Sequence, residues 1–101
     1  MVCRKMILSS PAKSMRLFDS HTHLQFSQFD LDREAVISRA RAAGVIGMIN
    51  VGTDLTTSQQ ALALAEAHDD MWATVGLHPT DTDQEFNKTE FTKLAQHPKV
   101  V

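Results

Sequence analysis

Two histidines stand one residue apart in the segment "DSHTHL", residues 19–24, and imidazole is a common metal ligand. In an extended segment, side chains at positions i and i+2 point to the same side, about 6.6 Å apart along the chain. We therefore expect His21 and His23 to face one way and Thr22 to face away. Two such rings can share one ion, because nitrogen binds zinc and similar metals at about 2.0 to 2.1 Å. Chance occurrence of the pattern is the competing interpretation.

A third histidine strengthens the metal interpretation. The segment "GLHP", residues 76–79, places His78 at the end of a later apolar strand pattern. The carboxyl ends of parallel strands meet at one rim, where barrel enzymes and open α/β sheets assemble their sites. We expect His78 on the same rim as the histidine pair. The alternative is a turn that happens to contain a histidine, with Pro79 ending the strand.

The rest of the chain supplies strand and helix patterns in alternation. Strand patterns occupy 16–19, 45–52 and 71–77, and helical patterns lie within 29–44, 55–70 and 87–98. Residues 99–101 look like the beginning of a fourth strand.

Local signals agree with these boundaries. Gly44 stands where a helix C-cap belongs, and Thr53 and Asp54 can cap the second helix. The run at 45–52 is apolar with little alternation, which is typical of a strand covered on both faces. Phe18 and Trp72 are most simply core residues.

Strand followed by helix, three times over, predicts an α/β protein built from parallel βα units. Two architectures fit, a doubly wound open sheet and a (β/α)₈ barrel, and a barrel needs about 250 residues where this chain has 101. A short parallel sheet would leave an unpaired edge and wet apolar surface, so the sequence looks like the front part of a larger protein. We expect residues 1–15 to be a disordered or misassigned arm, with Met1, Met6 and Met15 as alternative starts.

Composition narrows the possible functions. The chain is 43% hydrophobic and 22% charged, the profile of a soluble globular domain. Its net charge of −2 provides no basic field for a phosphate backbone, so binding of nucleic acid must depend on a local site. The single cysteine, Cys3, favours a reducing cytosol. No apolar run approaches the ~20 residues of a membrane span.

Three motifs together resemble the TatD-type metal-dependent deoxyribonucleases. They are "FDSHTHL" at 18–24, "VGT" at 51–53 and "VGLHP" at 75–79, and the resemblance runs from about Arg16 to Val101. His-x-His alone would fit much of the wider metallo-hydrolase superfamily, whereas the later "GLHP" narrows the match.

This resemblance implies a (β/α)₈ TIM-type barrel, of which residues 16–101 would form the first three βα units and the start of the fourth strand. It implies hydrolysis of phosphodiester bonds in DNA with two divalent ions, whose identity (zinc, magnesium, manganese or another) is open. His21 and His23 match the first metal ligands, and His78 matches a residue beside the substrate phosphate. The family's bridging glutamate, its two later histidines and its late aspartate have no counterpart in this chain, and no catalytic residue is assigned.

The expected function is therefore a TatD-like deoxyribonuclease acting in the cytoplasm, with DNA as its substrate and with no membrane or protein partner. Two alternatives stay open: an amidohydrolase or lactonase of the same superfamily, and a truncated product without activity. Two neutral histidines offer fewer ligands than the three that catalytic zinc usually takes from a protein. We therefore expect the 101 residues alone to bind metal weakly and to be inactive.

Overall fold

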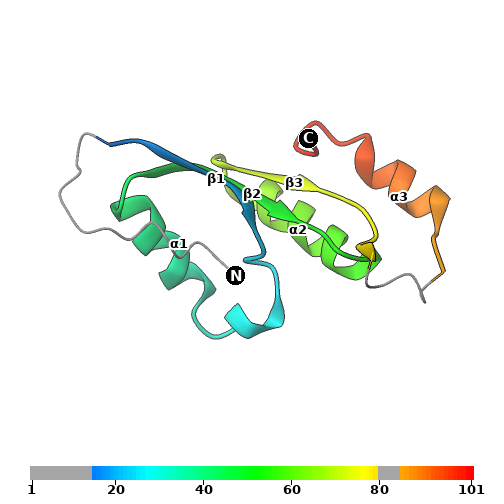
Figure 1. Ribbon diagram of the computed structural model, residues 1–101, viewed down its shortest axis with the longest axis horizontal. Coiled ribbons are helices and arrows are strands. Elements are labelled where there is room, and N and C mark those ends of the chain that lie inside the picture. Colours follow the sequence, from blue (N-terminus) through cyan, green and yellow to red (C-terminus); the bar gives the residue numbers. More distant parts are fainter. Residues whose placement is uncertain (1–14, 80–84) are drawn as a thin grey trace.

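The structure is a computed structural model, and it describes residues 15–79 and 85–101. Three strands form a parallel sheet in the order β1-β2-β3 (Figure 1): β1 (Leu17–Thr22), β2 (Val45–Val51) and β3 (Met71–Thr74). The helices alternate with the strands: α1 (Arg33–Ala42), α2 (Leu55–Ala67) and α3 (Lys88–Ala95), with a short 3-10 helix, η3 (Ser27–Phe29), before α1.

The chain beyond α3 returns to the sheet beside β3. A parallel bridge pairs Ala73 with Val100, and the amides of Ala73 and Val101 donate to the carbonyls of Lys99 and Ala73, each at 2.9 Å. This pairing is the predicted beginning of a fourth strand. The expected fold class, parallel βα units in sequence, is confirmed.

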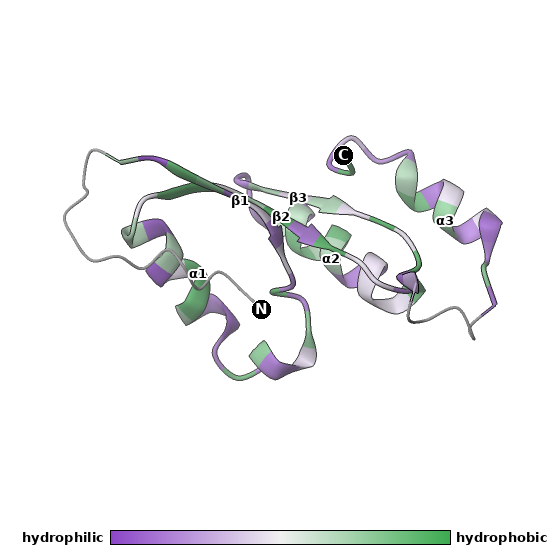
Figure 2. Cartoon of the chain, in the orientation of Figure 1, coloured by the Kyte–Doolittle hydropathy of each residue, from purple (hydrophilic) through white to green (hydrophobic). Residues whose placement is uncertain are grey.

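Helices α1 and α2 cover the same face of the sheet. Both helices share one hydrophobic core with the sheet. Its buried residues include Ile37 and Ala40 of α1, Ala61, Leu62 and Ala65 of α2, and Val45, Met48, Met71 and Ala73 of the strands. Figure 2 shows the hydrophobic residues following the strands, while α1 carries both kinds of residue. This one-sided cover follows from the right-handed connection of parallel strands.

In the described part of the chain α1 and α2 leave the opposite face of the sheet uncovered, and two predictions are wrong there. Phe18 is 51% exposed and Ile46 50% exposed, so β2 is not covered on both faces and Phe18 is not a core residue. Trp72 is half-buried, and its ring centroid lies 6.0 Å from that of Phe18. The error arises because apolar side chains are buried only where another layer covers them, and α1 and α2 both pack against the other face.

The transitions between strands and helices follow local chemistry. Gly44 ends α1 with a φ of +105°, a conformation that L side chains rarely adopt, and its carbonyl accepts from the amide of Leu17 at 2.8 Å. Asp54 caps α2 through a bond from the Thr57 amide at 2.8 Å, and the Thr57 hydroxyl accepts from the Asp54 amide at 3.0 Å. Both predicted helix ends are thus confirmed.

No helix in residues 15–79 and 85–101 is long and apolar enough to cross a membrane. The predicted arm at 1–15 lies outside the described residues apart from Met15.

An ion pair joins the last turn of α1 to the entry of β3. The guanidinium of Arg41 donates to both carboxylate oxygens of Asp70, at 2.8 and 2.9 Å. These hydrogen bonds, more than the opposing desolvation, hold the pKa of Asp70 below its ordinary value. The pair lies at the end of the sheet remote from the histidine rim.

We predict that Asp70→Asn lowers the free energy of unfolding by about 0.5–1 kcal/mol at pH 7, a small effect because solvent reaches both side chains of the pair. A carboxyl group whose pKa is lower in the folded protein than in the unfolded chain contributes its full stabilisation at pH values above the pKa of the unfolded chain. That stabilisation is lost as the pH falls through the pKa of the folded protein. Urea unfolding at pH 7 and at pH 3 should thus show that the free energies of unfolding of the unaltered protein and of Asp70→Asn differ less at pH 3. Asp69→Asn, at an exposed neighbouring position, is the control. A difference that does not change with pH would contradict the assignment.

Candidate metal centre

The histidine pair lies where β1 leaves its regular pairing with β2. Asp19 is opposite Met48 and Thr22 is opposite Asn50, so β1 has one extra residue between these points, as in a β-bulge. Thr22 is fully buried, whereas the neighbouring His21 is exposed. The bulge therefore turns the first histidine to the open side of the sheet.

The two rings meet as the spacing predicts. The ring centroids of His21 and His23 lie 5.0 Å apart, and the rings are inclined at 81°. His23 is half-buried, and it stacks on Phe26 at a centroid distance of 4.5 Å. Neighbouring imidazoles of this kind have the donor chemistry of a metal site, and their role as ligands stays a prediction.

A backbone hydrogen bond fixes the orientation of His23. Its Nδ1 lies 2.8 Å from the carbonyl oxygen of Val51, at the carboxyl end of β2. Because a carbonyl oxygen only accepts, Nδ1 must carry the hydrogen, and Nε2 then keeps the lone pair that a metal requires. Such a bond from the other ring nitrogen is the usual way in which proteins orient a histidine ligand.

The surroundings of His23 favour its neutral form. Burial lowers the pKa of this imidazole most, and nearby His21 and His78 lower it further, against the opposing effect of the Val51 carbonyl. A neutral imidazole is the form that binds a metal, so the site needs little deprotonation near pH 7.

His78 lies on the same rim, as expected. Its backbone amide donates to the carbonyl of Thr53 at 2.7 Å, which joins the segment after β3 to the loop after β2. Its side chain is exposed and close enough to influence His23 electrostatically. Within residues 15–79 and 85–101, no cluster of three or more His, Cys, Asp or Glu side chains could hold a metal ion. The described part of the chain thus brings together a pair of histidines and one neighbouring histidine.

The carboxylate of Asp19 binds the backbone of the histidine segment. Its Oδ1 accepts from the backbone amide of His21 at 3.2 Å. The carboxylate therefore supports the turn of the chain at the end of β1.

Two residues that hold the loop after His23 are not identified by the sequence patterns. Asn50 is fully buried, and its Oδ1 accepts from the amide of Leu24 at 3.0 Å. Arg33, at the start of α1, donates from Nε to the Leu24 carbonyl at 2.5 Å and from Nη2 to the Phe26 carbonyl at 2.9 Å. A polar residue within the apolar run at 45–52 was the available signal for Asn50, and Arg33 resembled an ordinary residue of a solvated helix face.

Gly52 of "VGT" and Gly76 of "VGLHP" both contact Ser58 of α2, which is fully buried. A Cβ on Gly52 would lie 2.6 Å from the Cα of Ser58, so α2 can approach the end of β2 only because this residue has no side chain. The amide of Gly76 donates to the hydroxyl of Ser58 at 3.1 Å. The ends of β2 and β3 are thereby held to the same helix turn.

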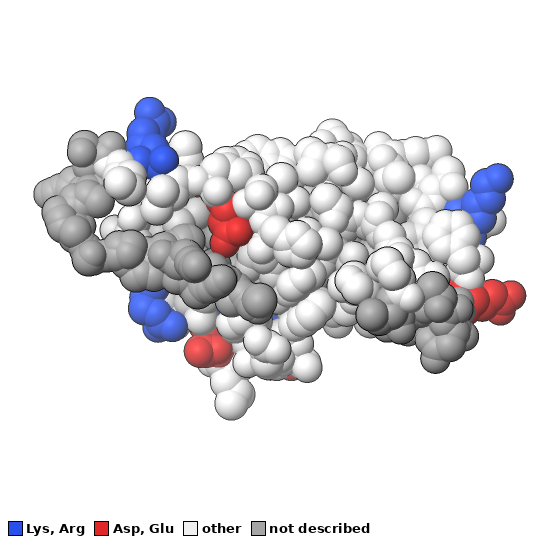
Figure 3. Space-filling view, in the orientation of Figure 1, with Lys and Arg blue, Asp and Glu red and all other residues white. Residues whose placement is uncertain are grey.

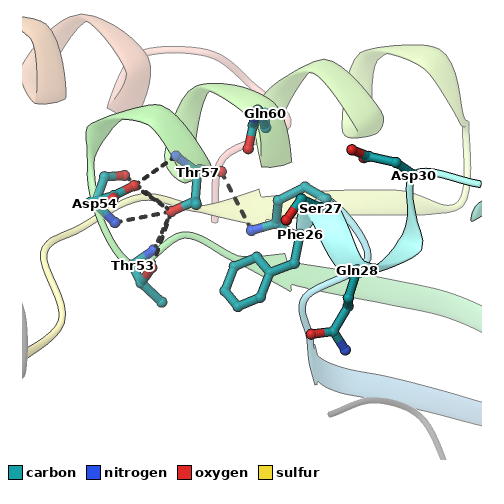
Figure 4. Close-up of a pocket in the computed structure, with 9 residues that line it drawn as sticks. Phe26, Ser27, Gln28, Asp30, Thr53, Asp54, Thr57 and Gln60 are labelled. Carbon is teal, nitrogen blue, oxygen red and sulfur yellow. Dashed lines mark hydrogen bonds between the residues drawn. The ribbon is translucent and has the colours of Figure 1, made fainter.

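A cavity of about 600 Å³ is lined by Phe26 (Figure 4), the residue that stacks on His23. One side is formed by residues 25–28 and Asp30, and the other by the first turns of α2 at 53, 54, 57 and 60. Figure 4 shows Phe26 extending between these two sides, with the hydrogen-bonded group of Thr53, Asp54 and Thr57 beyond it.

Parallel βα units with functional side chains at the carboxyl ends of their strands define the class of α/β proteins that build their sites on that rim. The model of one family, the TatD related DNases, matches residues 18–101. The chain therefore belongs to the family of TatD related DNases.

Curated relatives agree with this assignment. Proteins named 3'-5' ssDNA/RNA exonuclease TatD from Enterobacter lignolyticus and Citrobacter koseri are each 46% identical over 87 residues, covering 84% of this chain and 34% of the relative. The protein of that name from Pantoea ananatis is 56% identical over 64 residues, which cover 62% of this chain and 25% of the relative. The chain thus spans about a third of the length of the first two relatives.

We predict that Arg33→Met lowers the free energy of unfolding by about 1–3 kcal/mol, because backbone carbonyls of the loop after His23 lose a charged donor. Amide hydrogen exchange at residues 24–26 should accelerate more than exchange in β3. Arg39→Met, on the exposed side of the same helix, is the matched control and should change stability by less than about 0.5 kcal/mol. Equal effects of the two substitutions would contradict the proposed anchoring.

Proposed function

We propose that this chain contributes the first metal ligands of a hydrolase that cleaves phosphodiester bonds in DNA. The observation that supports this most is the paired arrangement of His21 and His23, with Nδ1 of His23 bonded to the Val51 carbonyl, inside a segment that matches the TatD related DNases. We further propose that residues 16–101 form the first βα units of a (β/α)₈ barrel, the remaining ligands coming from outside these residues.

The residues present fit a divalent metal. Two adjacent imidazoles, one with its proton fixed on Nδ1, offer nitrogen donors that suit zinc, manganese, nickel or iron. We propose two divalent ions per complete site, with His21 and His23 on one of them. When bound, such ions supply an activated water and neutralise charge on the phosphate. The chain's own contribution is to place the two imidazoles side by side and, through the Val51 bond, to leave Nε2 of His23 with its lone pair.

His78 is proposed to bind the substrate phosphate. Its exposed ring and its place beside His23 would allow it to donate a hydrogen bond to a phosphate oxygen as negative charge develops. The chain has a net charge of −2, and in Figure 3 the Lys and Arg side chains lie toward the two ends of the face shown, with Asp or Glu side chains between and beside them. Local contacts at the rim, in place of a long-range basic field, would then provide most of the affinity for nucleic acid.

We propose three further features. A cytoplasmic location agrees with the single cysteine, and no protein partner is proposed. The names of the curated relatives favour a nuclease over an amidohydrolase or lactonase. We expect the 101 residues alone to be inactive, because His21 and His23 supply only part of a ligand set.

We predict that His21→Ala and His23→Ala each reduce metal-dependent cleavage of a DNA oligonucleotide by more than about 100-fold, since even residues that only orient a metal ligand are worth about 10–100-fold. The assay uses the longest polypeptide that the reading frame encodes. His68→Gln is the control, because His68 lies at the opposite end of the sheet, beside Arg41. Unimpaired cleavage by either alanine variant would contradict the ligand assignment.

We predict a different result for His78→Ala. If His78 contacts the phosphate and no metal, kcat falls by about 10²–10³-fold, as for loss of one donor to developing charge. The metal concentration that gives half-maximal activity should stay the same. A large increase in that concentration would instead make His78 a metal ligand and overturn its assignment.

A further inference from the structure

We propose that the cavity beside the histidine pair binds an unpaired nucleobase of the substrate, next to the phosphate that is cleaved. The nature of the ligand is argued from the cavity itself. The placement of this ligand next to the cleaved phosphate rests on the function proposed above. The volume of about 600 Å³ is within the range of about 300–1,000 Å³ of small-molecule sites.

Phe26 provides an aromatic surface in the cavity. One side of its ring stacks on His23 at a centroid distance of 4.5 Å and an interplanar angle of 17°. The ring also lines the cavity, where Figure 4 shows it between the loop after β1 and the first turn of α2. Stacking on aromatic side chains is the principal way in which proteins bind unpaired bases, because every base has an aromatic face.

The charges around the cavity favour an uncharged ligand. Of the described residues that line it, none is Lys or Arg. Asp30 is paired with Arg33 at 2.7 Å, and Asp54 caps α2. A phosphate would therefore find no cation there, whereas the amide and hydroxyl groups of the lining suit the polar edge of a base.

Gln25 holds one wall of the cavity in place. The side chain is 4% exposed, and its Nε2 donates to the carbonyls of Val51 and Thr57 at 2.8 and 3.4 Å. Its Oε1 is buried and has no hydrogen-bond partner in the part of the chain that the structure describes. Through Nε2, Gln25 therefore joins the loop after β1 to the end of β2 and to α2, and it fixes the wall of the cavity against which a base would lie.

The cavity is connected to the histidines on two sides. Phe26 contacts His23 directly, and the carbonyl of Thr53 accepts from the backbone amide of His78 at 2.7 Å. A base stacked on Phe26 would therefore have its attached phosphate near the proposed metal ligands. The cavity would serve to fix the position of the strand relative to the reacting bond.

The test is equilibrium binding of two fluorescent trinucleotides to metal-free protein, one with a central adenine and one with an abasic central residue. The protein is the longest polypeptide that the reading frame encodes. The adenine trinucleotide should bind about 5- to 100-fold more tightly, the effect of one stacked base. Phe26→Ala should bring this ratio close to one, and Phe26→Tyr should preserve it. Phe86→Ala, which removes an exposed phenylalanine outside the cavity lining, is the matched control.

Equal binding of the two trinucleotides by the unaltered protein would overturn the proposal, and this comparison requires no variant to fold. A ratio that survives Phe26→Ala would overturn it as well. Because metal is absent, the measurement does not depend on cleavage. An inactive protein that still prefers adenine through Phe26 would refute the nuclease proposal alone, whereas an active one without that preference would refute only the base site.

Discussion

The carbonyl oxygen of Val51 is the acceptor on which the arrangement of the rim depends. It receives Nδ1 of His23 and Nε2 of Gln25, each at 2.8 Å, which uses both of its lone pairs. Val51 itself is paired with Thr74 in the parallel sheet. The orientation of a proposed metal ligand and the floor of the adjoining cavity are thus set by one backbone group whose position the sheet fixes.

The loop that carries these residues is held by directional polar contacts in addition to the burial of Leu24 in the core. The side chain of Asn50 accepts a hydrogen bond from the Leu24 amide, and the side chain of Arg33 donates to the carbonyls of Leu24 and Phe26. Because hydrogen bonds are directional, they fix the orientation of the loop as well as its position on the sheet. A site of this kind needs such support, because a displacement of about 1 Å is enough to impair catalysis.

The sequence predicts the parts of this arrangement that depend on neighbouring residues. The shared direction of His21 and His23 follows from the strand period, and the ends of α1 and α2 follow from Gly44 and Asp54. The TatD-type resemblance, based on three short motifs, is confirmed by the family match over residues 18–101.

Contacts between distant residues could not be predicted in the same way. His23 and Val51 are 28 residues apart, and Leu24 and Asn50 are 26 apart, so no local pattern connects them. The exposure of Phe18 was missed for a related reason, since residue type indicates a preference for burial but does not say which face of a sheet is covered.

The central claim is that His21 and His23 bind one divalent metal, His23 doing so through the Nε2 that its bond to Val51 leaves available. The most direct measurement is nitrogen-15 NMR of the histidine rings during addition of zinc to the longest polypeptide that the reading frame encodes. The account predicts that Nε2 of His23 and one nitrogen of His21 shift together, while Nδ1 of His23 keeps its proton and the rings of His68 and His97 are unchanged. A metal that shifts neither His21 nor His23, or that displaces the proton from Nδ1 of His23, would contradict it.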